Sequence, residues 1–145
     1  MSTTARDVAM HIVRTCSDEG RPISNLQLQK ILYFCQERSY RDVGRPLFGD
    51  DFEAWRYGPV VPDVYRLFSL FGGEKIRRKV EDRYLEDYER AIVDAVAREK
   101  RQMQPWDLVA ETHRPGSPWA KTYDGGAGNG RVIPKRLIRE SALRL

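Results

Sequence analysis

The sequence has 145 residues, of which 41% are hydrophobic and 32% are charged, and its formal net charge at pH 7 is +4. This composition is too apolar for a disordered chain, and the length suits one globular domain, so we expect a single domain over residues 1–145. No apolar run approaches the roughly 20 residues of a membrane helix. These features predict a cytoplasmic protein that has no membrane partner.

Apolar residues recur at helical spacing along most of the chain. The predicted helices cover residues 4–17, 24–41, 62–71, 81–102, 105–112 and 134–142. The second has the clearest start, because Ser24 followed by Gln27 fits a capping box. Its buried stripe should contain Leu28 and Leu32. This leaves Gln27, Gln29 and Lys30 for its other faces. The predicted fold is mainly α, a compact bundle of about six helices.

Glycines and prolines interrupt the helical pattern in the middle of the chain. Residues 50–57 predict a short strand or extended segment there. Residues 75–80 alternate weakly, and they are predicted to pair with this segment as a small β-hairpin. Gly58 should permit a tight turn after the strand, while Pro59 and Pro62 should direct the chain into the third helix.

The sequence contains no recognisable catalytic or cofactor motif. Residues 114–130 are predicted to be a loop, and their glycines lack both the spacing and the preceding strand of a dinucleotide-binding turn. Two histidines and two cysteines match the ligand count of a zinc site, but Cys16 and Cys35 fall on apolar stripes, where buried thiols are the usual case. No nucleophile, base and stabiliser form a set. We therefore predict no enzymatic activity, no metal and no cofactor.

Positive charge gathers toward the C-terminus. Residues 113–145 contain seven basic and two acidic residues, so the net positive charge of this stretch exceeds that of the whole chain. Lys135, Arg136 and Arg139 fall on the last predicted helix. Such a helix can attract nucleic acid, although it is more often a solvated face. Binding of nucleic acid is therefore kept as the alternative function.

Large aromatic side chains concentrate between Phe48 and Phe71. Aromatic rings beside arginine are typical of the residues that dominate binding energy at protein interfaces. The candidate binding residues, taken from this segment and from the basic stretch that follows it, are Trp55, Arg56, Tyr57, Arg66, Arg77, Arg78 and Lys79. The alternative is that Trp55 closes the core of a small α protein.

Three blocks of the sequence resemble the Panacea domain of SocA-like antitoxins, a family often described as phage-associated proteins. Residues 25–36, NLQLQKILYFCQ, resemble its LKLQKLLYYAQ helix. Residues 44–65, with GRPLF, FEAW, GPV and VY in order, resemble its second block, and residues 108–119 resemble its third. The motif residues, to which we assign structural roles, are Ser24, Gln27, Leu28, Lys30, Leu32, Gly58, Pro59, Pro62, Tyr65, His113, Pro118 and Trp119.

The resemblance spans residues 5–142 and implies an antitoxin that neutralises a separately encoded toxin by binding it. It implies a mainly helical fold and no cofactor, and it allows either occlusion of the toxin or delivery of the toxin to a cellular protease. Two departures stand out. The chain has no appended DNA-binding domain, and residues 125–130 replace a plainer linker. The toxin-facing surface is predicted to combine the aromatic segment, residues 77–79 and exposed positions of the second helix.

Overall fold

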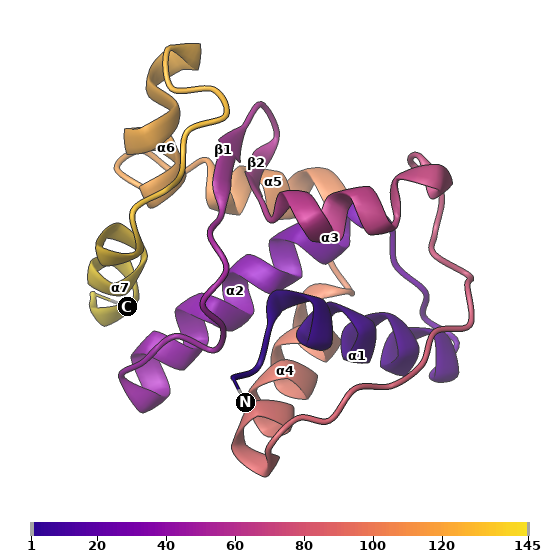
Figure 1. Cartoon of the computed structure of the whole chain (residues 1–145). Helices are drawn as coiled ribbons and strands as arrows, with labels where there is room; N and C mark the ends of the chain where they lie inside the picture. Colours follow the sequence, from indigo (N-terminus) through magenta and orange to yellow (C-terminus); the bar gives the residue numbers. More distant parts are fainter. Residues whose placement is uncertain (1, 145) are drawn as a thin grey trace.

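A computed structural model describes residues 2–144. In this range the chain forms seven α-helices, one two-stranded sheet and two short 3₁₀ turns, so the predicted mainly α class is confirmed (Figure 1). The elements in chain order are α1 (Ala5–Asp18), α2 (Asn25–Val43), β1 (Glu53–Trp55), β2 (Gly58–Val60), α3 (Pro62–Leu67), η1 (Ser69–Phe71), α4 (Asp87–Lys100), α5 (Pro105–Thr112), α6 (Pro118–Tyr123), η2 (Asp124–Gly126) and α7 (Lys135–Leu143).

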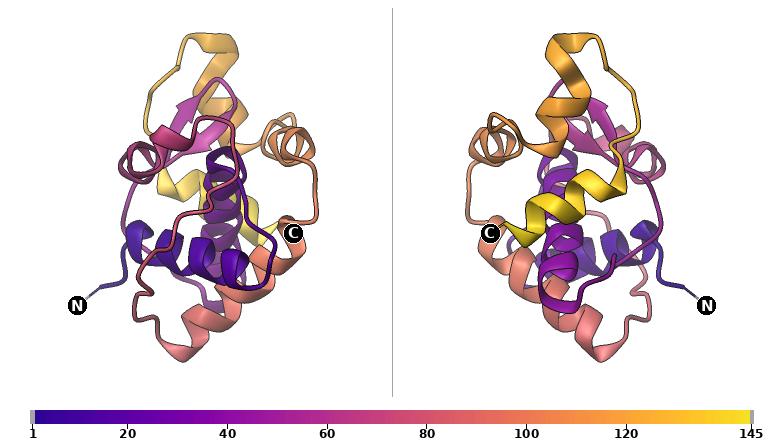
Figure 2. Two further views of the ribbon diagram at one scale, coloured as in Figure 1. Left: turned by 90° about the vertical axis from the view of Figure 1, so that its right-hand side faces the viewer. Right: turned by 90° about the vertical axis from the view of Figure 1, so that its left-hand side faces the viewer.

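Helix α2 runs through the middle of the molecule, and α1, α4, α5, α7 and β2 all pack against it (Figures 1 and 2). The predicted capping box is present, since the Ser24 hydroxyl accepts from the Gln27 N–H and the Gln27 side chain accepts from the Ser24 N–H. Leu28 and Leu32 are fully buried, as predicted. Because α2 has neighbours on several sides, 12 of its 19 residues are buried.

The polar residues at the start of α2, which were predicted to lie outside its buried stripe, are buried as well. Gln27, Gln29 and Lys30 are at most 5% exposed. Gln29 accepts a hydrogen bond from the Val61 N–H at 2.9 Å, so this side chain joins α2 to the segment after β2. Near the middle of the helix, Gln36 accepts from the Leu47 N–H at 2.8 Å. These glutamines satisfy loop backbone groups that would otherwise be buried without partners.

The β-hairpin is real, but its predicted second strand was wrong. Strand β1 pairs antiparallel with β2, which places Trp55 opposite Gly58 and leaves Arg56 and Tyr57 as a two-residue turn. The weakly alternating residues 75–80 instead lie extended beside α1 and α2. There the Ile76 N–H donates to the Ile23 carbonyl at 2.7 Å. A two-residue turn brings β2 to β1 at a much lower entropic cost than a loop of about twenty residues would.

Three further boundaries differ from the prediction. The helix predicted over residues 62–71 ends at Leu67 as α3, and the 3₁₀ turn η1 follows it. Helix α4 begins at Asp87 and not at residue 81, because residues 81–86 run extended and bring Asp82 to His11 on α1, with 3.0 Å between Oδ1 and Nδ1. The predicted loop at 114–130 contains α6, whose first turn is capped by the Ser117 hydroxyl accepting from the Ala120 N–H. The Ser-Pro pair at residues 117–118 is a normal helix-start signal that the loop prediction overlooked.

Candidate functional site

Two aromatic pairs flank the hairpin, and three of their four rings are exposed while Trp55 is half-buried. The rings of Trp55 and Tyr65 meet edge to face at 5.0 Å between centroids, and those of Tyr57 and Trp106 do so at 5.1 Å. Exposure remains high, with 44% for Tyr57, 37% for Tyr65 and 60% for Trp106. We call the residues Trp55, Arg56, Tyr57, Tyr65, Arg66 and Trp106 the hairpin surface.

The sequence analysis did not single out Trp106 as a binding residue. It comes directly after Pro105 at the first turn of α5, where the ring projects beside the hairpin turn and not into the core. A tryptophan in the first turn of a short helix, among polar neighbours, is the only signal that could have indicated this position.

The charges of the hairpin surface are partly free. The Arg56 guanidinium lies over the Tyr57 ring at 5.3 Å from its centroid and forms no ion pair with any residue in 2–144. Arg66 is paired with Asp63 at 3.0 Å, and both side chains are well exposed. The Trp55 indole N–H donates to the Glu53 carboxylate at 2.9 Å, which orients that ring. The surface therefore offers aromatic area with one unpaired cation at its tip.

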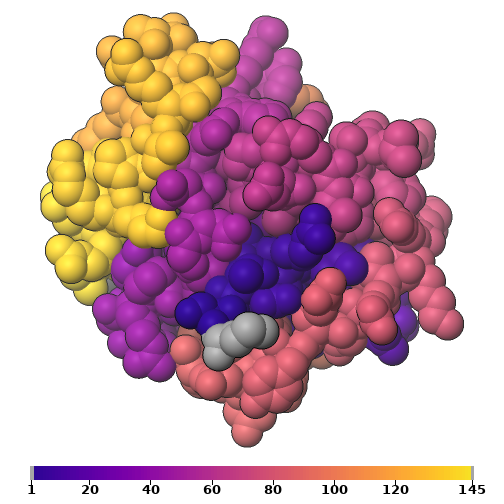
Figure 3. Space-filling model, in the orientation of Figure 1, coloured from indigo at the N-terminus to yellow at the C-terminus, as the bar shows by residue number. Residues whose placement is uncertain are grey.

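The other predicted binding residues lie elsewhere. Arg77, Arg78 and Lys79 are exposed on the extended segment between η1 and α4, away from the hairpin (Figure 1). This pink segment and the yellow helix α7 occupy opposite edges of the face seen in Figure 3. Residues 77–79 are therefore separate from the hairpin surface and from the basic residues of α7. We call residues 77–79 the second basic patch.

A buried lysine supports the hairpin from below. Lys30 has no exposed surface, and its Nζ donates to the Pro59 carbonyl at 3.1 Å. Burial lowers the pKa of Lys30 from 10.5 to about 7, because the charged form loses its hydration. Gly58 lies against the same side chain, at a φ of +112°. A Cβ there would come within 2.8 Å of both the Lys30 Cε and the Thr112 Oγ1, so only glycine fits.

The third sequence block meets the hairpin from its other side. The Trp119 indole N–H donates to the Trp55 carbonyl at 2.7 Å. The His113 ring stacks on Trp119 with 3.6 Å between centroids. The pKa of His113 is lowered mainly by burial and, to a smaller extent, by the nearby charge of Lys30. Pro118 is buried at the first position of α6, directly before Trp119. Motif residues more than fifty positions apart therefore converge on the hairpin.

Comparison with known proteins shows to which family the sequence is related. The family model described as "Antitoxin SocA-like, Panacea domain" matches residues 28–120. The chain is also 36% identical to the protein named Antitoxin SocA of Caulobacter vibrioides (strain NA1000 / CB15N), over 96% of this chain and 82% of that protein. The chain belongs to the SocA-like Panacea antitoxin family. No solved structure matches it.

The part of the chain that matches the Panacea domain contains the whole hairpin surface, together with Lys30 and Trp119, which contact the hairpin from below and from its other side. Lys30 lies near its start, Gly58 and Pro59 near its middle, and Trp119 near its end. The matched range stops before α7 and before the basic residues predicted to attract nucleic acid. On α7, Lys135 forms an ion pair with Asp51, which leaves Arg136 and Arg139 exposed.

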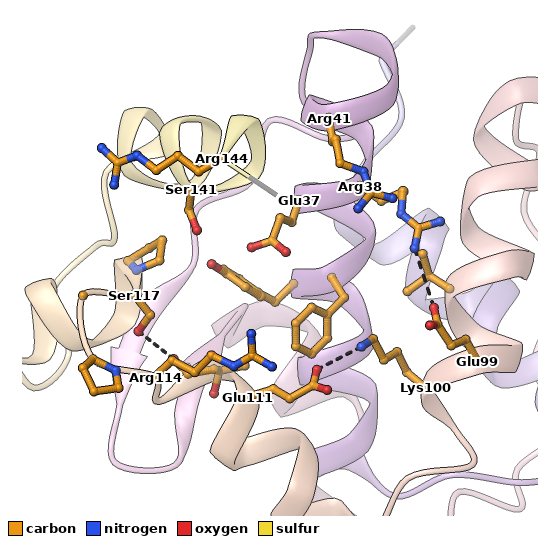
Figure 4. Close-up of a pocket in the computed structure, with 17 residues that line it drawn as sticks. Glu37, Arg38, Arg41, Glu99, Lys100, Glu111, Arg114, Ser117, Ser141 and Arg144 are labelled. Carbon is orange, nitrogen blue, oxygen red and sulfur yellow. Dashed lines mark hydrogen bonds and ion pairs between the residues drawn. The ribbon is translucent and has the colours of Figure 1, made fainter.

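A cleft of about 460 Å³ opens on another side of the molecule, between α2, α5 and α7 (Figure 4). Arg38 pairs with Glu99 at 3.6 Å, and Lys100 pairs with Glu111 at 2.9 Å. Glu37 also lines the cleft. Burial raises the pKa of the Glu37 carboxyl, and a hydrogen bond from the Tyr33 hydroxyl lowers it by a smaller amount. This cleft was not predicted, because its residues are scattered over five helices and the α5–α6 loop.

Within residues 2–144 no three histidine, cysteine, aspartate or glutamate side chains are grouped as metal ligands would be. Cys16 and Cys35 are free thiols in the interior, and burial raises the pKa of both. None of the helices described combines the length and apolar character needed to cross a membrane.

Proposed function

We propose that this antitoxin neutralises a separately encoded protein toxin by direct binding through the hairpin surface. The observation that carries the proposal is the two aromatic contacts at the surface, Trp55–Tyr65 and Tyr57–Trp106, in which every ring except the half-buried Trp55 is exposed. The unpaired Arg56 lies at the turn between them. Tryptophan, tyrosine and arginine are the residues most enriched among interface hot spots. Their exposure in a chain whose other large aromatic rings are mostly buried supports a role in contact with a partner.

The toxin would be recognised by side chains and not by addition of a strand. The outer edge of β1 is covered, since the Ala54 N–H donates to the Arg131 carbonyl at 2.8 Å and the Ala54 carbonyl accepts from the Gly130 N–H at 2.7 Å. The outer edge of β2 is covered as well. Pro59 has no N–H, its carbonyl accepts from Lys30, and the Val61 N–H donates to Gln29. No unpaired backbone edge is left for a partner strand.

The test is co-expression of this chain with the open reading frame next to it in the genome. We expect the neighbour alone to arrest growth, and we expect the antitoxin to restore growth and to co-purify with the neighbour's product. Trp106→Ala and Tyr57→Ala should weaken the complex by about tenfold or more while leaving the fold intact. The matched control is Tyr84→Ala, because Tyr84 is 80% exposed but lies on the extended segment before α4. A harmless neighbour that does not co-purify would contradict the proposal.

Two routes of neutralisation, occlusion of the toxin's active site and delivery to a cellular protease, give different results in the same cells. In the first, toxin accumulates as a stable complex. In the second, the half-life of the toxin shortens when the antitoxin is present and lengthens in a strain that lacks the protease. Both routes act in the cytoplasm and need no catalysis or cofactor from this chain.

The role of Arg77, Arg78 and Lys79 in toxin binding stays a prediction. Charge reversal at Arg77 and Arg78 tests it, because both side chains are exposed and the substitutions should not disturb the core. Weakened toxin binding keeps the second basic patch in the contact surface. Unchanged binding and neutralisation remove it.

Binding of nucleic acid through α7 remains the alternative. It predicts an affinity that falls steeply with salt and that is lost when Arg136 and Arg139 are made neutral. The ion pair between Lys135 and Asp51 already engages one of the three cations on which this alternative depends.

A further inference from the structure

We infer that the cleft between α2, α5 and α7 receives a segment of the toxin in which a lysine or arginine side chain stands next to a carboxylate. The inference rests on the proposed function, and it adds a second contact that lies away from the hairpin surface. It is carried by the charges that the cleft leaves unpaired and by the walls between them (Figure 4).

Most of the charged side chains that line the cleft already have partners. Arg38 is paired with Glu99, and Lys100 is paired with Glu111. Arg41, at the upper end, is paired with Asp42 at 3.3 Å. These contacts neutralise three of the cations of the cleft without any ligand.

Glu37, Arg114 and Arg144 are left, and Figure 4 shows the Arg144 guanidinium turned away from the cleft. Glu37 and Arg114 line the cleft, and neither forms an ion pair with a residue in 2–144. Figure 4 shows the Glu37 carboxylate projecting from α2 and the Arg114 guanidinium projecting from the α5–α6 loop toward the same space. A carboxylate held in a half-buried position gains most from a cation that enters the cleft, and a free guanidinium at its rim gains most from a carboxylate.

The walls suit the stem of a long basic side chain. The Tyr33 and Phe34 rings meet edge to face at 5.6 Å beneath the cleft, and Lys100 covers the Phe34 ring at 4.5 Å from its centroid. Lysine and arginine place their methylene groups along such apolar surface while the charged head reaches a polar partner. In this cleft the partner would be Glu37, and the neighbouring carboxylate of the ligand would stay at the rim with Arg114.

A purely anionic ligand would satisfy only one of these two groups. It could pair with Arg114, but it would leave the Glu37 carboxylate without a cation. The nearby cations Arg38 and Lys100 are already engaged by Glu99 and Glu111. Only a ligand that carries both signs of charge, in the order cation inside and anion outside, satisfies the two unpaired groups. A peptide segment with adjacent basic and acidic residues has that order of charges.

The experiment measures the dissociation constant of the purified toxin for full-length variants of this antitoxin. Glu37→Gln and Arg114→Gln should each weaken binding by about tenfold, because each leaves one charge of the toxin desolvated without its partner. Matched controls are Glu81→Gln and Arg136→Gln, which change the same residue types at exposed positions outside the cleft. Thermal melts of all four variants confirm that the fold is retained.

A double-mutant cycle separates contact from a structural effect. Each exposed lysine and arginine of the toxin is changed to methionine, and one of these changes should cost affinity in wild-type antitoxin but nothing further in Glu37→Gln. If toxin binds and depends on Trp106 while Glu37→Gln and Arg114→Gln bind like wild type, the inference is overturned and the proposed function stands. If wild-type antitoxin binds no toxin, the proposed function fails and the inference falls with it.

Discussion

The Nζ of Lys30 lies 3.1 Å from the carbonyl oxygen of Pro59, and no carboxylate among residues 2–144 is paired with it. A lysine without surface exposure and without a counter-ion is unusual, because a buried charge is normally paired or neutralised. In this antitoxin the lysine is the link between the central helix and the strand that turns into the hairpin surface. Its chemistry therefore connects the stability of the fold to the geometry of the proposed contact.

Lys30 should make the stability of the protein rise with pH. Burial lowers its pKa from 10.5 to about 7 in the folded state, so between these values the unfolded chain binds more protons than the folded chain. The free energy of unfolding should therefore increase as the pH rises from about 7 to 10.5, by an amount on the order of a few kcal/mol from Lys30 alone. Urea denaturation at pH 7, 8 and 9 measures it in wild type and in Lys30→Met. The difference between the two should grow with pH, and parallel curves would contradict the prediction. Lys75→Met, at an exposed site, is the control.

Gly58→Ala should destabilise the hairpin. The new Cβ would lie 2.8 Å from the Lys30 Cε and from the Thr112 Oγ1, at a φ of +112° that side chains rarely adopt. We expect a loss of at least about 2 kcal/mol in the free energy of unfolding, from strain and from displacement of the buried lysine. Gly49→Ala is the matched control, since its Cβ would meet no atom within 4 Å. Equal melting temperatures for the two variants would show that the close packing at Gly58 is not required.

Trp119→Phe should loosen β1 without emptying the core. The substitution keeps an aromatic ring to stack on His113 but removes the indole N–H that donates to the Trp55 carbonyl at 2.7 Å. Loss of this bond should cost about 1–3 kcal/mol and should speed hydrogen exchange in the hairpin amides. Trp106→Phe, at a 60% exposed position, should change stability by less than about 0.5 kcal/mol. Unchanged amide exchange in Trp119→Phe would refute the role assigned to this bond.

Among the glycines of residues 125–130, Gly128 should be the one whose replacement by alanine destabilises the protein most. A Cβ at this position would lie 1.8 Å from the Thr122 carbonyl oxygen, which is backbone and cannot move aside on its own. We expect a loss of several kcal/mol in stability, on the order of 2–4, or a failure to fold. The exposed neighbour Asn129→Ala should be nearly neutral. Comparable denaturation midpoints for the two variants would be evidence that the loop can be rebuilt without this contact.

The sequence predicted the local parts of this fold well. The capping box at Ser24 and the start of α5 at Pro105 depend on neighbouring residues alone, and both are present. The buried stripe of α2 follows from helical spacing in the same way. The extended segment predicted at residues 50–57 contains β1, and it was recognised because the glycines and prolines on both sides of it exclude a helix.

Long-range relationships were not predictable in the same way. Gln29 and Lys30 look like surface residues when only their own helix is considered, and they are buried because β2 and the loop after it bring backbone partners to them. The partner of β1 was misassigned, since weak alternation at residues 75–80 carries no information about distance in space. The pairing of Trp106 with Tyr57 joins positions about fifty residues apart, and no local pattern indicates it.

In the hairpin, backbone hydrogen bonds hold the structure in place, and the side chains of the turn are left to contact a partner. Every outward backbone group described above for β1 and β2 is bound by the antitoxin's own residues, so the turn between them can change its side chains without changing what holds it in place. Substitutions at Arg56 and Tyr57 then alter what the surface recognises at little cost to folding. A scaffold of this kind can acquire a new partner through a few point mutations, and it offers no open strand through which two copies could aggregate.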